Sequence, residues 1–250
     1  MSGHSKWAGI KHKKALIDAK KGKAFTKSIR EIMMAAKLGG GSPENNPRLR
    51  LAIEKAKDFN MPTENIKRAI AKGTGEAGAV ALEQVIYEGY GPAGVAVIVE
   101  GLTDNRQRTS SEIRSIFTKY NGNLGQSGCV GWLFERKGIL RIERKEVEEE
   151  PLLSLVLEVG AEDLNTEEDE YEVTTKPEDL EKIKKILEEK RIKISEASLT
   201  MLPKSTVKLE GKDAENIIKL MDRLEESEDV QNVYGNFDIA DEVIEAVTTR

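Results

Sequence analysis

The spacing of the apolar residues changes once along the chain, near residue 83, and this change constrains the fold more than any other feature. Before it, apolar residues recur at three- and four-residue steps, the period of one helix face, at Phe25, Ile29, Ile32, Met33 and Ala36. Glycines at residues 39–41 are predicted to end this helix, because glycine adopts the left-handed conformation at little cost. Asn46 is predicted to cap a second helix with Pro47 at its first position, and Pro62 to open a third that ends at Gly73. Residues 1–78 are therefore predicted to form a basic arm and a small helical domain.

After residue 83 the apolar residues follow the alternation and the short continuous runs that are typical of strands. Strands are predicted at residues 85–87, 94–102 and 129–134, with a helix near residues 105–120 that Asp104 caps. The chain closes with predicted elements at residues 206–209 (strand), 212–226 (helix) and 230–237 (strand). Each piece is too small to fold alone, so we expect residues 79–134 and 205–250 to form one discontinuous α+β domain.

Residues 135–204 have a self-contained order of predicted elements, β-α-β-β-α-β, which is the ferredoxin-like order. The predicted strands are 138–142, 161–164, 171–175 and 192–202, and the predicted helices are 147–159 and 177–190. An inserted domain needs its two ends close together, so we expect Glu135 and Ser205 to be neighbours. The predicted fold class is multidomain, α and α+β, with an N-terminal helical bundle, an α+β domain and a ferredoxin-like α+β domain inserted into it.

The net charge of −5 conceals two oppositely charged regions. Residues 1–75 carry a net charge of +11, and residues 76–250 carry −16. This asymmetry is typical of chains that bind nucleic acid or that use a charged tail for interactions. Lysine and glutamate supply most of the charged residues, which make up 33% of the chain, and this bias predicts a heat-adapted source.

Several classes of protein are excluded by what the sequence lacks. The longest apolar run is residues 95–99, whereas a membrane-spanning helix needs about 20 residues, so no membrane partner is expected. The N-terminus lacks the apolar segment of a secretory signal. The single cysteine, Cys129, indicates a reducing cytoplasm, and two histidines with one cysteine argue against a zinc site. We therefore expect a cytoplasmic protein without a metal.

Catalysis and small-molecule binding find little support in the sequence. Gly89, Gly91 and Gly94 spell G-x-G-x-x-G, but they precede a strand instead of opening a helix, so we interpret them as a β-hairpin turn. No carboxylate pair lies in an apolar setting that would separate its pKa values, and we expect no catalytic residue, cofactor or small-molecule substrate. The acidic stretch 143–172 is interpreted as a solvated face, with a surface for a basic partner as the alternative.

The basic arm carries the strongest functional pattern. It interleaves lysines and histidines with a tryptophan, which suits phosphate contact by charge and stacking of an unpaired base on the ring. The candidate nucleic-acid-binding residues of the arm and the first helix are His4, Lys6, Trp7, Lys11, His12, Lys13, Lys14, Lys20, Lys21, Lys23, Lys27 and Arg30. The alternative is a solubilising tail, although such tails rarely carry a tryptophan.

A second candidate cluster contains Asn105, Arg106 and Arg108, at a predicted helix start. Cations at this end oppose the helix macrodipole, which suggests a phosphate or an acidic partner. A surface ion pair within the acidic domain explains the same residues equally well.

Long motifs across nearly the whole chain resemble the YebC family, which includes the mitochondrial translational activator of cytochrome c oxidase. They include S-G-H-S-K-W-A-G-I-K-H-K-K at residues 2–14, N-P-R-L-R-L-A-I-E-K-A-K at 46–57, L-T-D-N-R-Q-R-T at 102–109 and Q-N-V-Y-G-N-F-D at 231–238. Ser2, Gly9 and Gly235 stand where the family commonly has Ala, Asn and His. The resemblance implies the three domains described above and a non-enzymatic, cytoplasmic role in gene expression.

Two nucleic-acid partners follow from the resemblance. Bacterial members are generally described as DNA-binding transcriptional regulators, whereas the mitochondrial relative and some bacterial members resemble ribosome-associated translation factors. The residues themselves favour RNA or the ribosome, because the third helix offers only Asn65, Lys67 and Arg68 as polar groups for a major groove. The main interpretation is a probable DNA-binding transcriptional regulatory protein, and the alternative is a translational activator that binds rRNA or the ribosome through its basic arm.

Overall fold

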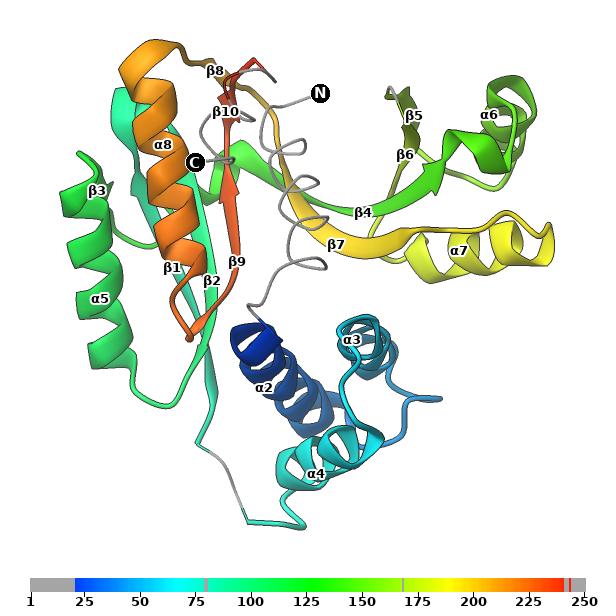
Figure 1. Ribbon diagram of the computed structural model, residues 1–250, viewed down its shortest axis with the longest axis horizontal. Coiled ribbons are helices and arrows are strands. Elements are labelled where there is room, and N and C mark those ends of the chain that lie inside the picture. The colour runs from blue at the N-terminus through cyan, green and yellow to red at the C-terminus, as the bar shows by residue number, and fades with distance from the viewer. Residues whose placement is uncertain (1–20, 79–80, 168, 241–242, 244–250) are drawn as a thin grey trace. The chain divides into compact units, whose positions relative to one another are not determined.

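The computed structural model describes residues 21–78, 81–167, 169–240 and 243 and, at Lys21, the backbone alone (Figure 1). The chain divides into two compact units. The smaller unit comprises residues 134–202, and the larger unit comprises residues 1–133 and 203–250.

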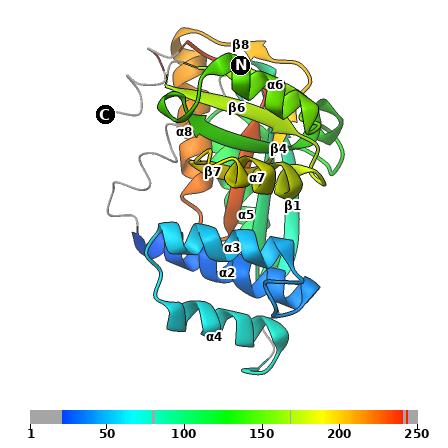
Figure 2. The same ribbon diagram turned by 90° about the vertical axis from the view of Figure 1, so that its right-hand side faces the viewer.

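The described part of the larger unit opens with the helices α2 (Lys21–Gly39), α3 (Pro47–Asp58) and α4 (Thr63–Thr74) (Figures 1 and 2). α2 packs against both α3 and α4, and their shared core includes Ile32, Leu49, Ala52, Ile66 and Ala69. The predicted Asn46 cap is confirmed: its side-chain oxygen accepts from the Leu49 N–H at 3.0 Å. Its amide donates to the carbonyls of Ala35 and Gly40, both at 2.8 Å, so one buried side chain joins the end of α2 to the start of α3.

The predicted end of the third helix at Gly73 is wrong. α4 continues to Thr74, and Gly75 takes the left-handed conformation, with φ of 88°. Gly73 is required for packing instead, because a Cβ there would lie 2.3 Å from the Met33 carbonyl oxygen of α2. This glycine therefore sets how closely α4 can approach α2.

A four-stranded sheet follows, with strand order β3-β1-β2-β9. Its strands are β1 (Glu83–Tyr90), β2 (Ala96–Thr103), β3 (Asn123–Leu124) and β9 (Val230–Gly235). β1 and β2 pair antiparallel across the short turn Pro92–Gly94, which confirms the predicted hairpin at the three glycines. The helices α5 (Arg106–Lys119) and α8 (Gly211–Glu225) cover one face of the sheet (Figure 1). The core on that face includes Val97, Val99, Ile113, Phe117, Ile217 and Leu220.

The strand predicted at residues 129–134 is wrong over most of its length. Residues 127–128 form a turn and residues 129–130 a bend, Gly131–Leu133 is a short 3-10 helix, and the edge strand that pairs with β1 is β3. The cause is Glu88 of β1, whose carboxylate accepts the N–H groups of Gly128, Val130 and Gly131 at 2.6 to 2.8 Å. Three backbone donors of one short loop converge on this side chain and curl the loop, so its backbone cannot form a ladder.

The last predicted strand is interrupted near its end. After β9, the chain forms β10 (Phe237–Asp238), which pairs in parallel with β8 (Val207–Lys208) in a separate small sheet. Asn236 lies between the two strands, and its side-chain oxygen accepts from the Ala96 N–H at 2.7 Å. The Asn236 side-chain oxygen thus replaces a backbone carbonyl as the acceptor for the Ala96 N–H, at the point where the chain leaves the larger sheet.

The smaller unit has its elements in the predicted order β-α-β-β-α-β, and its sheet has the strand order β5-β6-β4-β7. The elements are β4 (Phe134–Glu143), α6 (Glu149–Glu158), β5 (Asp163–Thr166), β6 (Glu170–Thr175), α7 (Leu180–Glu189) and β7 (Glu196–Pro203). A 3-10 turn, Arg144–Glu146, precedes α6. The predicted helix start at Pro177 is early, because residues 176–179 form a turn in which the Asp179 N–H donates to the Lys176 carbonyl at 3.1 Å.

The interpretation of the acidic stretch as a solvated face is wrong for its last residues. Arg141 of β4 is buried and lies opposite Glu172 of β6 in the antiparallel register. Its guanidinium forms ion pairs with the carboxylates of Glu172 and Glu170, each at 2.5 Å, and with that of Glu196 at 3.4 Å. Burial raises the pKa of Glu172, and the charge of Arg141 opposes that shift. These carboxylates therefore belong to an internal ion-pair network.

Candidate nucleic-acid interface

Three basic side chains of α2 are directed at the C-terminal end of α8 and the loop after it, in the same unit. Lys23 Nζ donates to the Glu226 carbonyl at 3.3 Å, Lys27 Nζ to the Glu225 carbonyl at 2.5 Å, and Arg30 Nη1 to the Glu228 carbonyl at 2.7 Å. The last carbonyls of a helix lack partners within the helix and carry partial negative charge. Three residues that the sequence predicts to contact nucleic acid thus have a structural role as well, because Lys23 and Lys27 bind carbonyls at the end of this helix and Arg30 binds one in the loop that follows it.

Positive charge remains concentrated around these contacts. The pKa of Lys27 is lowered to about 8, mainly by burial and to a smaller extent by the nearby charges of Lys55, Lys23 and Arg30, while the charge of Glu225 opposes the shift. Lys23 and Lys55 are exposed. Lys27 lies in a group of like charges that repel one another, and a bound anion would reduce this repulsion.

In the described part of the larger unit, the Asp229 carboxylate receives hydrogen bonds from four side chains, although no pattern in the sequence marks this residue. Its side chain is only about 3% exposed and receives Arg30 Nη1 at 2.5 Å, Arg108 Nη2 at 2.8 Å and the Thr109 hydroxyl at 2.6 Å. The Thr103 hydroxyl also donates to it, at 3.3 Å. Burial raises the pKa of Asp229, but the hydrogen bonds from Arg108, Thr109 and Arg30 outweigh burial and hold the pKa below its usual value. One carboxylate therefore joins α2, β2, α5 and the loop before β9.

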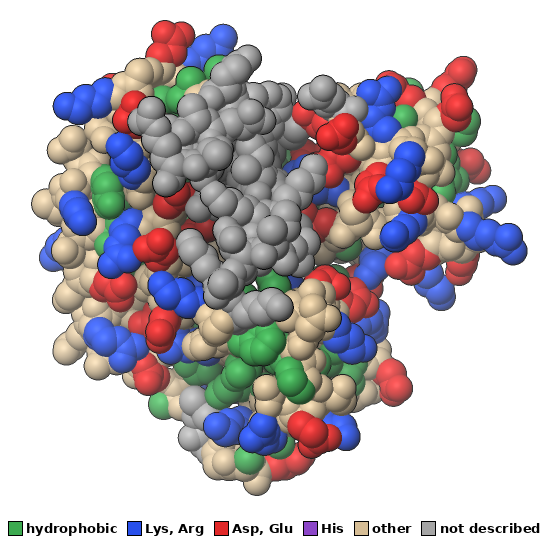
Figure 3. All heavy atoms as spheres, in the orientation of Figure 1, with side chains coloured by type: hydrophobic (Ala, Val, Ile, Leu, Met, Phe, Trp, Pro, Cys, Tyr) green, Lys and Arg blue, Asp and Glu red, His purple; other side chains and the backbone are tan. Residues whose placement is uncertain are grey.

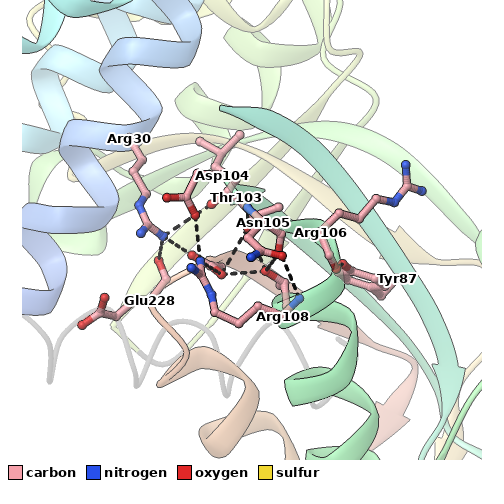
Figure 4. A network of polar contacts seen from close by, with 11 residues as sticks. Arg30, Tyr87, Thr103, Asp104, Asn105, Arg106, Arg108 and Glu228 are labelled. Carbon is pink, nitrogen blue, oxygen red and sulfur yellow. Dashed lines mark hydrogen bonds and ion pairs between the residues drawn. The ribbon is translucent and has the colours of Figure 1, made fainter. Parts of the chain in front are cut away.

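The second predicted cluster separates into three different roles (Figure 4). Asn105, and not Asp104 as predicted, caps α5, because its side-chain oxygen accepts from the Arg108 N–H at 3.0 Å. Arg108 pairs with Asp104 at 2.9 Å and with Asp229, so the ion-pair interpretation applies to it. Arg106 points away from this network and is exposed, and no described residue forms an ion pair or side-chain hydrogen bond with it.

The remaining candidates lie outside what the structure describes. These are His4, Lys6, Trp7, Lys11, His12, Lys13, Lys14 and Lys20, and Lys21 is described only as the first residue of α2. On the face drawn in Figure 3, the described lysines and arginines are interspersed with aspartates and glutamates. Within the described residues no group of three or more His, Cys, Asp or Glu side chains could hold a metal ion. None of the described helices is long and apolar enough to cross a membrane.

Two family models together match most of the chain. A model described as the TACO1/YebC protein N-terminal domain matches residues 5–76, and one described as the TACO1/YebC second and third domain matches residues 82–237. The chain belongs to the TACO1/YebC family. The resemblance inferred from the motifs is thereby confirmed.

Relatives of this TACO1/YebC protein match it over nearly its full length. A probable transcriptional regulatory protein of Dictyoglomus turgidum is 55% identical over 249 residues, which cover 99% of this chain and all of the relative. One of Geotalea uraniireducens is 57% identical over 242 residues, which cover 97% of this chain and 98% of the relative. The crystal structure of a conserved hypothetical protein from Aquifex aeolicus is similar, with a TM-score of 0.82 and 53% identity, over 90% of this chain and 93% of that one. The mixed α and β fold with antiparallel sheets is therefore shared with a solved structure.

Proposed function

We propose that this chain is a non-enzymatic, cytoplasmic regulator of gene expression that binds nucleic acid, as a DNA-binding transcriptional regulatory protein. The observation that carries the proposal is that relatives of at least 55% identity over nearly the whole chain bear the name probable transcriptional regulatory protein. The net charge of +11 in residues 1–75 supports it, because neutralised phosphates release counterions and favour association. The cation group of Lys23, Lys27 and Lys55 continues this charge into the described fold.

In this proposal the basic arm supplies most of the affinity, and Arg106 adds a phosphate contact from the α+β part. Arg106 suits that role because its guanidinium is exposed and forms no ion pair or side-chain hydrogen bond with a described residue, although its charge acts on nearby Tyr87. Lys27, Arg30 and Arg108 act mainly by holding α2 and α5 in place, since each already has a partner in the fold. The arm residues His4, Lys6, Trp7 and Lys11–Lys14 remain predictions from the sequence.

A specific observation favours the alternative, binding to rRNA or the ribosome. The polar residues of α4 that could read a major groove pair with one another: Arg68 Nη2 donates to Asn65 Oδ1 at 2.5 Å, and Lys67 pairs with Glu64 at 3.3 Å. A helix whose polar side chains are engaged along its own surface has little left to read base edges. Under this alternative the arm inserts into structured RNA.

A direct competition decides between the two partners. The full chain is mixed with purified ribosomes and an excess of duplex DNA at physiological salt, and sedimentation separates the two pools. The DNA proposal predicts that the protein stays with the duplex, and co-sedimentation with ribosomes under excess duplex would contradict it. Removal of residues 1–20, which leaves α2 intact, should weaken either complex and flatten its salt dependence, since five lysines are lost.

We also propose that residues 135–204 form an independently folding ferredoxin-like domain, inserted between residues 79–134 and 205–250 and preceded by the helical domain of residues 1–78. The element order and the strand order β5-β6-β4-β7 support this division, as does a separate core that includes Leu140, Leu152, Val173, Ile183 and Leu187. The excised segment should unfold cooperatively as a monomer. An unstructured fragment would contradict an autonomous inserted domain.

A further inference from the structure

Two exposed aromatic rings are fixed by one backbone carbonyl. The side chain of Trp132 is 66% exposed, and its indole N–H donates to the Cys129 carbonyl at 3.1 Å. Tyr90 of β1 is 40% exposed, and its hydroxyl donates to the same carbonyl oxygen, also at 3.1 Å. The polar atoms of both rings are thereby satisfied within the protein, and much of their aromatic surface stays open to solvent.

The loop that carries Trp132 is held rigidly against the sheet. Glu88 is about 7% exposed and accepts three loop N–H groups, and its backbone carbonyl accepts a fourth from Gly125 at 2.8 Å. A Cβ at Gly125 would lie 2.5 Å from Cys129 Sγ, so a larger residue there would force the Cys129 side chain to shift. A buried carboxylate is costly unless it is well hydrogen-bonded, so the loop N–H groups must stay in position around Glu88. The loop backbone therefore has one defined conformation. This fixed loop holds the exposed Trp132 ring in a defined position.

The two rings lie at the face of the sheet opposite α5 and α8. Alternate residues of a strand point to opposite faces, and Tyr87 packs in the core on the helix side. Ile86, Glu88 and Tyr90 therefore point the other way, and Ile86 is 58% exposed. Along β1 this face presents Tyr90, whose hydroxyl shares a carbonyl with the Trp132 indole, and Ile86 farther along the same strand. The β2 residues that pair with β1 on this face, Ala96 and Ile98, are buried.

The surrounding segment is uncharged in a chain that is one-third charged. No Asp, Glu, Lys or Arg occurs from Tyr120 to Phe134. Its exposed polar side chains are amides and a hydroxyl, on Asn121, Asn123, Gln126 and Ser127. Amides can hydrogen-bond base edges, and the absence of carboxylates in this segment avoids repulsion of a phosphate backbone.

The size of the apolar surface favours a base over a protein. Among the described residues of the larger unit, the large apolar side chains that are exposed are Leu38, Ile86, Tyr90 and Trp132. A stable protein interface buries about 800 Å² on each partner, far more than two rings and one isoleucine provide. Aromatic rings on a sheet face are a common platform for unpaired bases, which stack on them regardless of sequence.

We propose that Trp132 and Tyr90 form a stacking site for one or two unpaired bases of single-stranded RNA or DNA. This site lies outside the basic arm and rests on the proposed nucleic-acid-binding function. The arm supplies charge, and the aromatic site supplies a preference for unpaired over paired strands. The amides of the 120–134 segment contact the edges of the stacked bases.

The chain has only two tryptophans, so a Trp7→Phe variant makes the intrinsic tryptophan fluorescence a signal from Trp132 alone. This variant is titrated with an oligonucleotide of about 12 nucleotides, within the range of known single-strand sites, as RNA, as DNA and as the matched DNA duplex. Binding is followed independently by the anisotropy of a label on the oligonucleotide. The proposal predicts that a single strand quenches the Trp132 fluorescence and that the duplex quenches it little. Comparison of the RNA and DNA titrations shows which of the two single strands is preferred.

Substitutions in the otherwise native chain test the same site. Trp132→Ala should weaken single-strand binding by roughly 10- to 100-fold, whereas Trp132→Phe retains a ring and most of the affinity. Leu38→Ala removes an equally exposed apolar side chain on α2 and serves as the matched control, with affinity unchanged. Melting temperatures are measured for each variant, and Trp132→Ala should match the native chain because its ring is mostly solvated.

Each contrary result has a distinct meaning. If anisotropy shows a bound single strand without quenching, and Trp132→Ala binds it normally, the stacking site is wrong while nucleic-acid binding stands. If the full chain binds neither single strand nor duplex, both the proposed function and the stacking site are wrong. If Trp132→Ala leaves oligonucleotide binding intact but abolishes self-association in sedimentation, the two rings form a protein contact and the proposal is overturned.

Discussion

Arg30 of α2 and Asp229 of the loop before β9 form an ion pair with 2.5 Å between Nη1 and Oδ1, across 199 positions of the chain. Arg108 of α5 shares the same carboxylate. The pair therefore fixes the first described helix of the basic region to the acidic α+β sheet. By holding α2 in place, the ion pair positions the cations of this helix for the proposed binding of nucleic acid.

Replacement of Asp229 should be the most damaging single change in this network. Asp229→Asn keeps the shape but removes the buried charge that Arg30 and Arg108 share, and Arg108 keeps only exposed Asp104 as an ion-pair partner among the described residues. The substitution should lower the free energy of unfolding by about 2–4 kcal/mol. Asp104→Asn is the control, because Asp104 is exposed and Arg108 is its ion-pair partner among the described residues, so the loss should stay below about 1 kcal/mol. Denaturant titration of both variants measures the two losses. Equal losses would show that Asp229 is not the centre of the network.

Glu88 should make stability depend on pH in the acid range. Burial raises its pKa, but the N–H groups of Gly128, Val130 and Gly131 outweigh burial and hold the pKa below the ordinary 4.5. The stabilisation is then fully present above about pH 4.5 and is lost as pH falls through the lower folded-state pKa. Glu88→Gln should cost about 1–3 kcal/mol at neutral pH, and the difference from the native chain should shrink as the pH falls below 4.5. Unfolding curves at several pH values check this, and a difference that is constant with pH contradicts it.

The sequence predicted most of the helices and strands because their signals are local. The Asn46 side chain can cap a helix and Pro47 suits its first position, so these two residues mark the start of α3. The spacing of apolar residues marks which helix and strand faces enter the core. The errors arise where a distant residue decides. Gly73 looks like a helix end until Met33 is known to pack against it, and residues 129–134 look like a strand until Glu88 captures their N–H groups.

The candidate site divides in the same way. Charge along the chain identified the basic region, but it could not separate a free cation from a paired one. Arg106 and Arg108 are two positions apart and equally basic, yet only Arg108 reaches Asp229, because residues two apart on a helix point in different directions. Asp229 itself carried no sequence signal, since its partners lie on α2, β2 and α5.

Arg106 and Arg108 should therefore respond differently to the same substitution. Arg106→Ala should leave the melting temperature unchanged and weaken nucleic-acid binding, with the salt slope reduced by about one phosphate contact. Arg108→Ala should instead lower stability by about 1–3 kcal/mol, because it removes a partner of buried Asp229. Thermal unfolding and binding at several salt concentrations give both quantities for each variant. A reversed pattern would mean that Arg108 is the ligand contact.

Lys27 should produce a pH effect of the opposite sign to that of Glu88. Its folded-state pKa is about 8, below the ordinary 10.5, so the unfolded chain binds more protons between these values. Stability from this group therefore rises as the pH increases from 8 to 10.5, by on the order of 1–3 kcal/mol. Lys27→Met should remove that rise, so the native chain gains stability over the variant as the pH increases. Lys37→Met is the matched control on α2, because Lys37 is exposed and also donates to a distant carbonyl, that of Leu82.

Trp7 tests whether the basic arm binds nucleic acid or serves the fold. It stands among lysines in a segment without an apolar period, so we predict that it stacks on an unpaired base of the bound nucleic acid. Trp7→Ala should then weaken binding by roughly 1–3 kcal/mol and leave thermal stability nearly unchanged. If Trp7 is instead a packing anchor of the helical domain, the same substitution should cost about 3–5 kcal/mol of stability. Both quantities are measured on one variant, and a large fall in melting temperature with intact binding would assign the arm to the fold.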